Sequence, residues 1–595
     1  MSDSRAPASA KQVRTGVAVL VAASVVYALL AQTVFPFGAD EALYIGAAKS
    51  MAAGHGYQAA GRFLSLYPPG WPLLLVPVEW LTNGAYGWFS RYTAALIPLM
   101  FYASWMLFSS RAERRVWWLI AALVASTAVF DFGTREVRSE IAFTALTTGF
   151  LAWAERTKEL RPAGWLNVSS TFGALLLLGA LGTRSIGVAL FGAVVMTGLH
   201  VAIAQRDRFR SYAQRMMLPL LTGALYEVIW GRWAKAHVVE SYPGEPTAYN
   251  RQFWLRDGHN LAAGEASVFE VLGRIPGNIR IQAAHVGSLL TNIDWIAPTW
   301  TSPIVVVATV ALIAGLVDEW RRKLPLLCWY VVGYMSVLSV WTYDEGTRYI
   351  MPLIPLLVLL AVSGYRAIAR IFAQRPGAVL RAASLVAAIE LAGLSIGMQR
   401  EPGAIGKQTL VAFAFWGVCI VTGLLTEFRM ILPGSMAVRR IVSYSRLAYI
   451  VGYFALGATG IVRMARFNRS GEVQLPGQAI RRVSDWLAAN ATDSSIVMAR
   501  QYGSLNLITH RRTVPYPQTL NVDLLRNAII RQKPTLLVVI DSTAYEYYFP
   551  SEPARLAVIE KAINARLTQR ARLQGASIYE FPRAIETPST PYVRH

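Results

Sequence analysis

Two acidic residues, Asp40 and Glu41, follow the first long apolar segment of the chain and open a short stretch of helical character. A carboxylate just outside a membrane span can take a proton from a nucleophile at the membrane surface, which is the work of a general base. Asp40 is therefore the first catalytic candidate and Glu41 the second. Tyr44 lies one helical turn after Asp40 and is expected on the same face.

The position of Asp40 at the start of a helix would by itself explain why an acidic residue occurs there. If Asp40 begins the helix, the field at the helix N-terminus favours its ionised form. The alternative is that Asp40 only caps a surface helix, because Asp is a preferred N-cap residue. That alternative leaves the following segment Tyr67-Pro68-Pro69-Gly70 unexplained.

Basic residues supply the second half of a possible site. Where a phosphate leaves a substrate, fixed donors must meet the negative charge that develops. An arginine fork can hold two phosphate oxygens at once. The candidates for phosphate binding are Arg348, Arg138, Arg184, Lys49 and Arg62. The alternative is that these side chains anchor span ends or pair with acidic neighbours.

Tyr44 and three further residues are candidates for supporting a substrate or a metal. Glu140 can orient an acceptor, pair with an arginine or help to hold a divalent ion. His55 lies in a Gly-His-Gly turn, and Tyr349 follows Arg348 directly. No cofactor is certain from the sequence, and the question of a divalent metal ion stays open.

The elements that must position these residues are membrane spans. The chain has 595 residues, of which 54% are hydrophobic and only 15% charged, a composition typical of membrane proteins. Each span needs about 20 mostly apolar residues. About thirteen segments qualify: 15–35, 88–110, 116–132, 139–154, 166–182, 185–204, 216–231, 300–317, 324–342, 349–365, 379–397, 408–426 and 447–464.

The excess of basic residues, 57 Lys and Arg against 35 Asp and Glu, follows these segments and does not indicate nucleic acid. Alternate short connections each hold at least three Lys or Arg, and among them are 206–215 and 366–381. This is the positive-inside pattern, which predicts a cytoplasmic N-terminus and, after an odd number of spans, an outer C-terminus. The first segment is expected to be a retained signal anchor.

The chain divides into a transmembrane part, residues 1–466, with outer loops at 36–87 and 232–299, and an outer C-terminal part, residues 467–595. In this last part, helical stretches alternate with short apolar strands, which predicts a small α/β domain. The helices are expected at 478–489, 522–531 and 554–571, and the strands at 496–499, 535–540 and 577–581.

Ionisable residues near the membrane gather toward the outer side, where they outline a cavity with both signs of charge. A transporter would place some of them near the midplane. Carboxylates and guanidinium groups at one face are better suited to a reaction on an anionic lipid headgroup.

The segment Asp40-Glu41-Ala-Leu-Tyr44, then Gly54-His55-Gly56-Tyr57 and Tyr67-Pro68-Pro69-Gly70, resembles the first outer loop of the C-type (GT-C) membrane glycosyltransferases. Arg348-Tyr349-Ile-Met-Pro352-Leu-Ile-Pro355 is similar to a late signature of that group. The lipid A aminoarabinose transferases and the protein O-mannosyltransferases are the most similar members. The resemblance covers roughly residues 15 to 465.

The resemblance implies a polytopic helical protein that transfers a sugar, with inversion, from a polyprenyl monophosphate donor to a lipid, glycan or protein acceptor at the outer face. It also implies a bacterial inner (plasma) membrane with a periplasmic active side. Other functions remain: a flippase or transporter of polyprenol-linked glycans, a glycan polymerase or ligase, and a scaffold. A flippase would show repeat symmetry or polar groups across the membrane, and the sequence shows neither.

Overall fold

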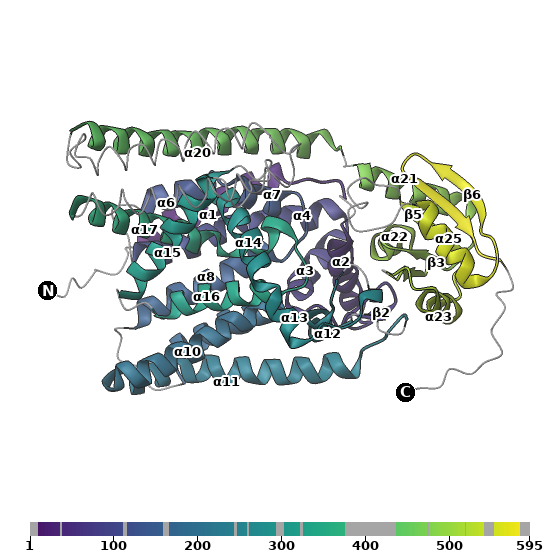
Figure 1. Cartoon of the computed structure of the whole chain (residues 1–595), viewed down its shortest axis with the longest axis horizontal. Helices are drawn as coiled ribbons and strands as arrows, with labels where there is room; N and C mark the ends of the chain where they lie inside the picture. Colours follow the sequence, from purple (N-terminus) through teal and green to yellow (C-terminus); the bar gives the residue numbers. More distant parts are fainter. Residues whose placement is uncertain are drawn as a thin grey trace.

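The computed structural model describes residues 10–35, 38–110, 116–158, 166–242, 245, 247–258, 261–292, 303–321, 325–374, 436–472, 475–517, 519–540 and 552–582. Over these ranges the chain forms a large bundle of helices and, at one end of it, a smaller region that contains a sheet (Figure 1). The bundle holds the candidate site, at the end that faces the sheet.

The bundle is built mainly from apolar helices of varied length. Its first half contains α1 (Ala10–Leu30), α2 (Ala39–Ala52), α3 (Gly70–Thr82), α4 (Tyr86–Ala95), α5 (Ile97–Ser109), α6 (Val116–Val124), α7 (Thr127–Thr134), α8 (Glu140–Thr157), α9 (Val168–Thr183) and α10 (Val188–Ala204). Its second half contains α11 (Arg206–Ala236), α12 (Tyr249–Trp254), α13 (Val268–Gly273), α14 (Ile275–Thr291), α15 (Pro303–Arg321), α16 (Pro325–Val340), α17 (Ile354–Gln374) and α20 (Met436–Ser470).

The expected spans overlap these helices, except for 379–397 and 408–426, which lie outside the described residues. Four described helical segments are long and apolar enough to cross a membrane alone, and the bent pair α6 and α7 makes a fifth. The four are Tyr86–Ser109, Ser185–Ala204, Met351–Ile371 and Ile450–Ser470. The protein is thus a helical membrane protein, and the count of thirteen spans remains a prediction.

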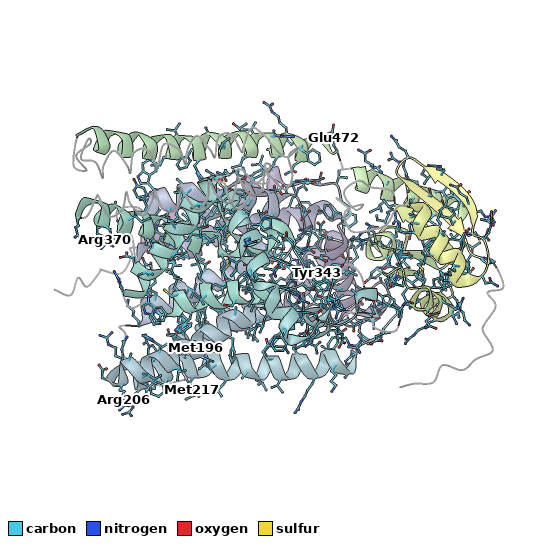
Figure 2. The ribbon with its side chains drawn as sticks, viewed as in Figure 1. Met196, Arg206, Met217, Tyr343, Arg370 and Glu472 are labelled. Atoms are coloured by element: carbon cyan, nitrogen blue, oxygen red, sulfur yellow. The ribbon has the colours of Figure 1, made fainter. Side chains whose placement is uncertain are left out.

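Two of the predicted basic connections can be located in the fold. Figure 2 shows Arg206 and Arg370, from two of those connections, at the end away from the sheet region. Glu472, by contrast, lies where α20 leads to the sheet region. These two arginines thus lie at the same end of the bundle, as the positive-inside pattern predicts for their connections.

The first outer loop is a compact unit that packs on the bundle. Between α2 and α3 it forms a short antiparallel hairpin of β1 (Gln58–Ala59) and β2 (Arg62–Phe63). At the start of α3, a Cβ added to Gly70 would lie 2.5 Å from the carbonyl oxygen of Gly182 in α9. Only glycine allows this approach, so the last residue of the Tyr-Pro-Pro-Gly motif fixes α3 against the end of α9.

The C-terminal region is a five-stranded mixed sheet of strand order β4-β3-β5-β7-β6. Its strands are β3 (Val497–Ala499), β4 (Thr513–Pro515), β5 (Leu536–Ile540), β6 (Thr568–Leu573) and β7 (Ala576–Glu580). Strand β3 pairs in parallel with β4 and β5, and β7 pairs antiparallel with β5 and β6. The helices are α21 (Leu475–Asn490), α22 (Tyr502–Thr509), α23 (Val522–Gln532) and α25 (Glu552–Ile563).

Helices cover both faces of this sheet. Side chains of β5 alternate between the two faces: Leu536 and Val538 pack with α21 and α22, whereas Leu537 and Val539 pack with α23 and α25. The α/β character expected from the sequence is therefore present.

One expected helix is too long. The stretch 554–571 was expected to be helical throughout, but α25 ends at Ile563 and Thr568–Leu573 forms strand β6. The reason is local: Asn564 has a left-handed backbone with φ of 51°, a conformation that ends helices. The strand that follows forms a hairpin with β7.

Candidate functional site

The site begins at the N-terminus of α2. Gly38 is the N-cap residue, with extended backbone, and Asp40 and Glu41 fall in the first turn. Successive helical residues point about 100° apart, so the two carboxylates enter different surroundings. Asp40 does not cap the helix, because its oxygens bind side chains from elsewhere in the fold.

Asp40 is bound by two donors. The Tyr67 hydroxyl donates to Oδ1 at 2.8 Å, and Arg348 Nη2 donates to Oδ2 at 2.5 Å. Tyr67 comes from the Tyr-Pro-Pro-Gly motif, and Arg348 lies in the short 3-10 helix η4 (Gly346–Tyr349) that precedes α17. The two motifs that carry the resemblance thus meet at this carboxylate.

Arg348 also binds two other carboxylates. Its Nε donates to Glu140 Oε1 at 2.6 Å and its Nη1 to Glu345 Oε2 at 3.2 Å. Glu140, at the start of α8, is fully buried and also pairs with Arg184 Nη1 at 2.7 Å. Asp40, Arg348, Glu140 and Arg184 form what we call the central cluster.

The central cluster keeps Asp40 charged. Burial alone would raise the pKa of Asp40, but the positive charges of Arg348 and Arg138 and the hydrogen bonds from Arg348 and Tyr67 outweigh it. The pKa of Asp40 therefore lies below its usual value, so the group is ionised at neutral pH. The side chain of Asp40 remains 22% exposed, so it can still reach a substrate.

Glu41 faces a second group, the flanking cluster of Glu41, Arg138 and Glu136. Its carboxylate is fully buried, lies 3.8 Å from Arg138 Nε and accepts a bond from the Tyr86 hydroxyl at 3.4 Å. Arg138 is also paired with Glu136. Burial, together with the negative charge of Glu136, raises the pKa of Glu41 well above its usual value.

Three sequence candidates lie apart from both clusters. Lys49 is two and a half turns beyond Asp40 on α2, and its Nζ lies beside Gly84 after α3. His55 is exposed in the turn after α2. Arg62 binds Glu245 at 3.0 Å and the Tyr502 hydroxyl at 3.0 Å, so it joins the outer loops to the C-terminal region.

Tyrosines line the central cluster. The ring of Tyr44 is buried and lies edge-on to Tyr67, with centroids 5.2 Å apart. Tyr349 shares the 3-10 helix of Arg348, and its carbonyl oxygen accepts a bond from Tyr334 at 2.7 Å. Tyr44 and Tyr349 therefore both border the cluster, as the sequence suggested for residues near Asp40 and Arg348.

Sequence reasoning missed Tyr249, which opens α12 in the second outer loop. Its ring lies 6.4 Å from Tyr67, its hydroxyl is bonded to the Ser185 side chain, and the charges of Arg184, Asp40 and Arg348 act on it. No motif surrounds Tyr249 in the sequence. Only the folding of the loop back over α2 brings it to the site.

The carboxylates of the site are poorly suited to hold a metal ion. Across the described residues, no group of three or more His, Cys, Asp or Glu side chains is arranged to bind one. Asp40, Glu140 and Glu345 all share Arg348 as partner. Each of these three carboxylates therefore already has a guanidinium group as a cationic partner.

Comparisons with known proteins give matches in structure only. No protein-family model matches the chain, and no curated protein sequence matches it. ArnT from Cupriavidus metallidurans, solved bound to undecaprenyl phosphate, aligns over 98% of this chain and 100% of its own with 16% identity and a TM-score of 0.52. The apo form of that protein aligns over 97% and 100%, with 14% identity and a TM-score of 0.52.

The Archaeoglobus fulgidus oligosaccharyltransferase also matches, over 90% of this chain and 70% of its own, at 12% identity and a TM-score of 0.47. That score is too low to support any inference here. The two ArnT structures span the whole chain, including the C-terminal region. The chain therefore has the fold of ArnT, a lipid A aminoarabinose transferase of the GT-C group, and the resemblance seen in the sequence is confirmed at the level of fold.

Proposed function

We propose that this protein is an inverting glycosyltransferase that moves a sugar from a polyprenyl-monophosphate donor to a lipid, glycan or protein acceptor at the outer face of a membrane. The observation that carries the proposal is the ion pair of Asp40 with Arg348, 2.5 Å apart. It places an ionised, partly exposed carboxylate beside a guanidinium group that can receive a phosphate.

Two further observations support the donor class. Arg348 and Arg184 lie together on the Glu140 carboxylate, and two arginines side by side suit the oxygens of a phosphate. The protein with the shared fold, ArnT, was solved with undecaprenyl phosphate. A polyprenyl phosphate linked to a sugar is therefore the donor class we infer.

The contact that a donor phosphate would replace is the one between Arg348 and Glu345. Of the three carboxylates on Arg348, Glu345 has the longest distance, 3.2 Å, and the most exposed side chain, at 40%. Its departure would free Arg348 Nη1 for a phosphate oxygen while Nε and Nη2 keep their partners. Arg348 would then hold the base and the leaving group at once.

The reaction is a single displacement. The acceptor hydroxyl or amine attacks the anomeric carbon, and its proton passes to Asp40 as the new bond forms. The bond between the anomeric carbon and the phosphate oxygen breaks, and its electron pair leaves with the phosphate. Arg348 and Arg184 stabilise the charge on that phosphate. Attack opposite the leaving group inverts the anomeric centre.

The same proposal includes the arrangement in the membrane. We assign about thirteen spans, a cytoplasmic N-terminus, a transmembrane part over residues 1–466 and an outer part over 467–595, in a bacterial inner membrane. Helix α20 continues to Ser470, so the linker between the parts would follow that residue. The positive-inside pattern and the placement of Arg206 and Arg370 at one end support this orientation (Figure 2).

The test is sugar transfer by the purified protein in lipid nanodiscs, with a panel of polyprenyl monophosphate and diphosphate sugars. The expected result is turnover of one monophosphate donor, loss of turnover in Asp40→Asn, and unchanged donor binding by that variant. Turnover of diphosphate donors alone would contradict the proposal and favour a polymerase or ligase. Transport of a glycan lipid without transfer would favour a flippase.

A further inference from the structure

The C-terminal region touches the catalytic helix directly. Helix α22 packs along α2: the Ser504 hydroxyl, which is buried, donates to the carbonyl oxygen of Gly38 at 3.3 Å. A Cβ added to Gly503 would lie 3.1 Å from Cδ2 of Leu43 and 3.6 Å from Cβ of Ala42. These contacts fall on the N-cap of α2 and on its first turns, beside Asp40.

The same helix completes the apolar packing on two sides of α2. Tyr502 packs on the cluster that contains Leu43, whereas Leu507 packs on the cluster that contains Tyr44. In the bundle view, α22 lies at the inner edge of the sheet region, next to α2 (Figure 1). Residues more than 450 positions later in the chain thus form part of the core around the helix that carries the candidate base.

Polar contacts also join the outer loops to the C-terminal region near α2. The Tyr502 hydroxyl accepts a bond from Arg62 Nη2 at 3.0 Å, and the Arg62 guanidinium lies over the Tyr502 ring, 5.1 Å from its centroid. Arg62 also pairs with Glu245 of the second outer loop. Gln532 of α23 binds the backbone of that loop at Ser241. Both outer loops are therefore tied to the C-terminal region where it meets α2.

We propose that α22 is a positioning element for the reaction, and that Ser504, Gly503 and Tyr502 set where the start of α2 places Asp40 relative to Arg348. The C-terminal region then acts on the chemistry through α2, without touching a substrate. The proposal deepens the glycosyltransferase assignment and rests on it for its kinetic consequence. Its structural part, the hold of α22 on α2, does not depend on the reaction.

The test uses the full-length protein in nanodiscs. Gly503→Val adds methyl groups against Leu43 and Ala42, and its control is Gly452→Val, since a Cβ at the helical residue Gly452 meets nothing within 4 Å. Ser504→Ala removes the bond to Gly38, and its control is Ser484→Ala, because the buried Ser484 hydroxyl bonds only within its own helix, to Ile480 at 2.9 Å. Tyr502→Phe removes only the bond to Arg62.

Two readouts are compared. The first is hydrogen exchange of the amides of α2 (Ala39–Ala52), which should speed up in Gly503→Val and Ser504→Ala and stay unchanged in both controls. The second is steady-state kinetics. Gly503→Val should lower kcat by about 10-fold to 100-fold with donor KM unchanged, because a small displacement of a catalytic group has effects of that size. Ser504→Ala and Tyr502→Phe should lower kcat by smaller factors.

The outcomes separate this inference from the function. Unchanged exchange in α2 for Gly503→Val and Ser504→Ala would overturn it, and so would faster exchange with unchanged kcat, which would leave α22 a merely structural support. A rise in donor KM with constant kcat would overturn it in favour of substrate binding by this region. If the wild type turned over no donor while exchange in α2 responded as expected, the proposed function would fall and the hold of α22 on α2 would stand.

Discussion

Asp40 and Glu41 are adjacent in the chain, but their carboxylates have different surroundings in the fold. Asp40 lies in the central cluster, where Arg348 and Tyr67 bind it. It keeps partial exposure and has a lowered pKa. Glu41 enters the flanking cluster, is fully buried beside Glu136 and has a raised pKa. The difference teaches that two adjacent acidic residues can have opposite surroundings: we propose the partly exposed Asp40 as the base, whereas Glu41 is enclosed by other side chains.

The largest effect that this comparison predicts is the loss of turnover on substitution of Asp40. Asp40→Asn should lower kcat by about 100-fold to 10,000-fold, the usual range for loss of a general base, and leave donor binding intact. The control is Asp131→Asn, which changes a carboxylate paired with Arg135 at 2.7 Å outside the central cluster. A loss of similar size in the control would show a general effect of charge.

The same carboxylate predicts a pH dependence. Because the folded pKa of Asp40 lies below the unfolded value, its ion pair adds stability above the unfolded pKa, about 3.9, and that stability is lost as pH falls through the folded pKa. Activity should therefore show no acid limb from Asp40 between about pH 5 and 7. An acid limb in this pH range that is present in the wild type and absent from the residual turnover of Asp40→Asn would contradict the lowered pKa of Asp40.

The second prediction concerns Arg348, which holds the central cluster together. Arg348→Met should leave Glu140 buried with one cationic partner fewer and Asp40 without its cation, and it should destabilise the protein by about 3–5 kcal/mol. Arg348→Lys should retain more stability but little activity, since an ammonium group cannot reproduce the fork. The measurement is thermal unfolding alongside turnover. Equal activity of Arg348→Lys and wild type would show that the separate nitrogens of the guanidinium group are not needed and would contradict the proposed role.

Substitution of Glu41 in the flanking cluster should affect turnover less than substitution of Asp40. The pH dependence of its contribution to stability should have the opposite sign. Glu41→Gln should retain turnover, because Glu41 is fully buried away from the partly exposed Asp40 and the raised pKa of its carboxyl favours the neutral form that glutamine imitates. A raised folded pKa means that the wild type loses stability as pH rises above the unfolded pKa, whereas the variant does not. The melting temperature of Glu41→Gln relative to wild type should therefore increase as the pH rises above the unfolded pKa of Glu, about 4.3. A relative decrease would show that Glu41 is ionised and supported by Arg138.

The smallest effect on turnover is expected for Lys49, which belongs to neither cluster. Lys49→Met should change kcat and donor KM by no more than about threefold, as is usual for substitutions away from such sites. Its matched comparison is Arg184→Met, which removes a cation from the central cluster and should lower kcat strongly. A loss for Lys49→Met as large as that for Arg184→Met would mean that the phosphate path passes along α2.

The sequence predicted much of the bundle and the core of the site, because both depend on local patterns. Apolar runs predicted the helices, and the motifs around Asp40 and Arg348 predicted two side chains that do meet. Local patterns could not predict contacts between segments that lie far apart in the sequence. Arg62 was a candidate for phosphate binding from its sequence position alone, which did not predict that it would bind Glu245 and Tyr502. Tyr249 had no motif at all, and helix α22 gave no sign of contacting α2.

The pairing of Asp40 with Arg348 joins positions 308 residues apart, and this separation has a consequence in time. At the usual pace of synthesis, about 5 to 20 residues per second, roughly 15 to 60 s pass between the two residues. During that interval the ribosome has delivered Asp40, Glu140 and Arg184 but not the guanidinium that joins them. The central cluster can therefore be completed only late in synthesis, when more than half of the chain has been made.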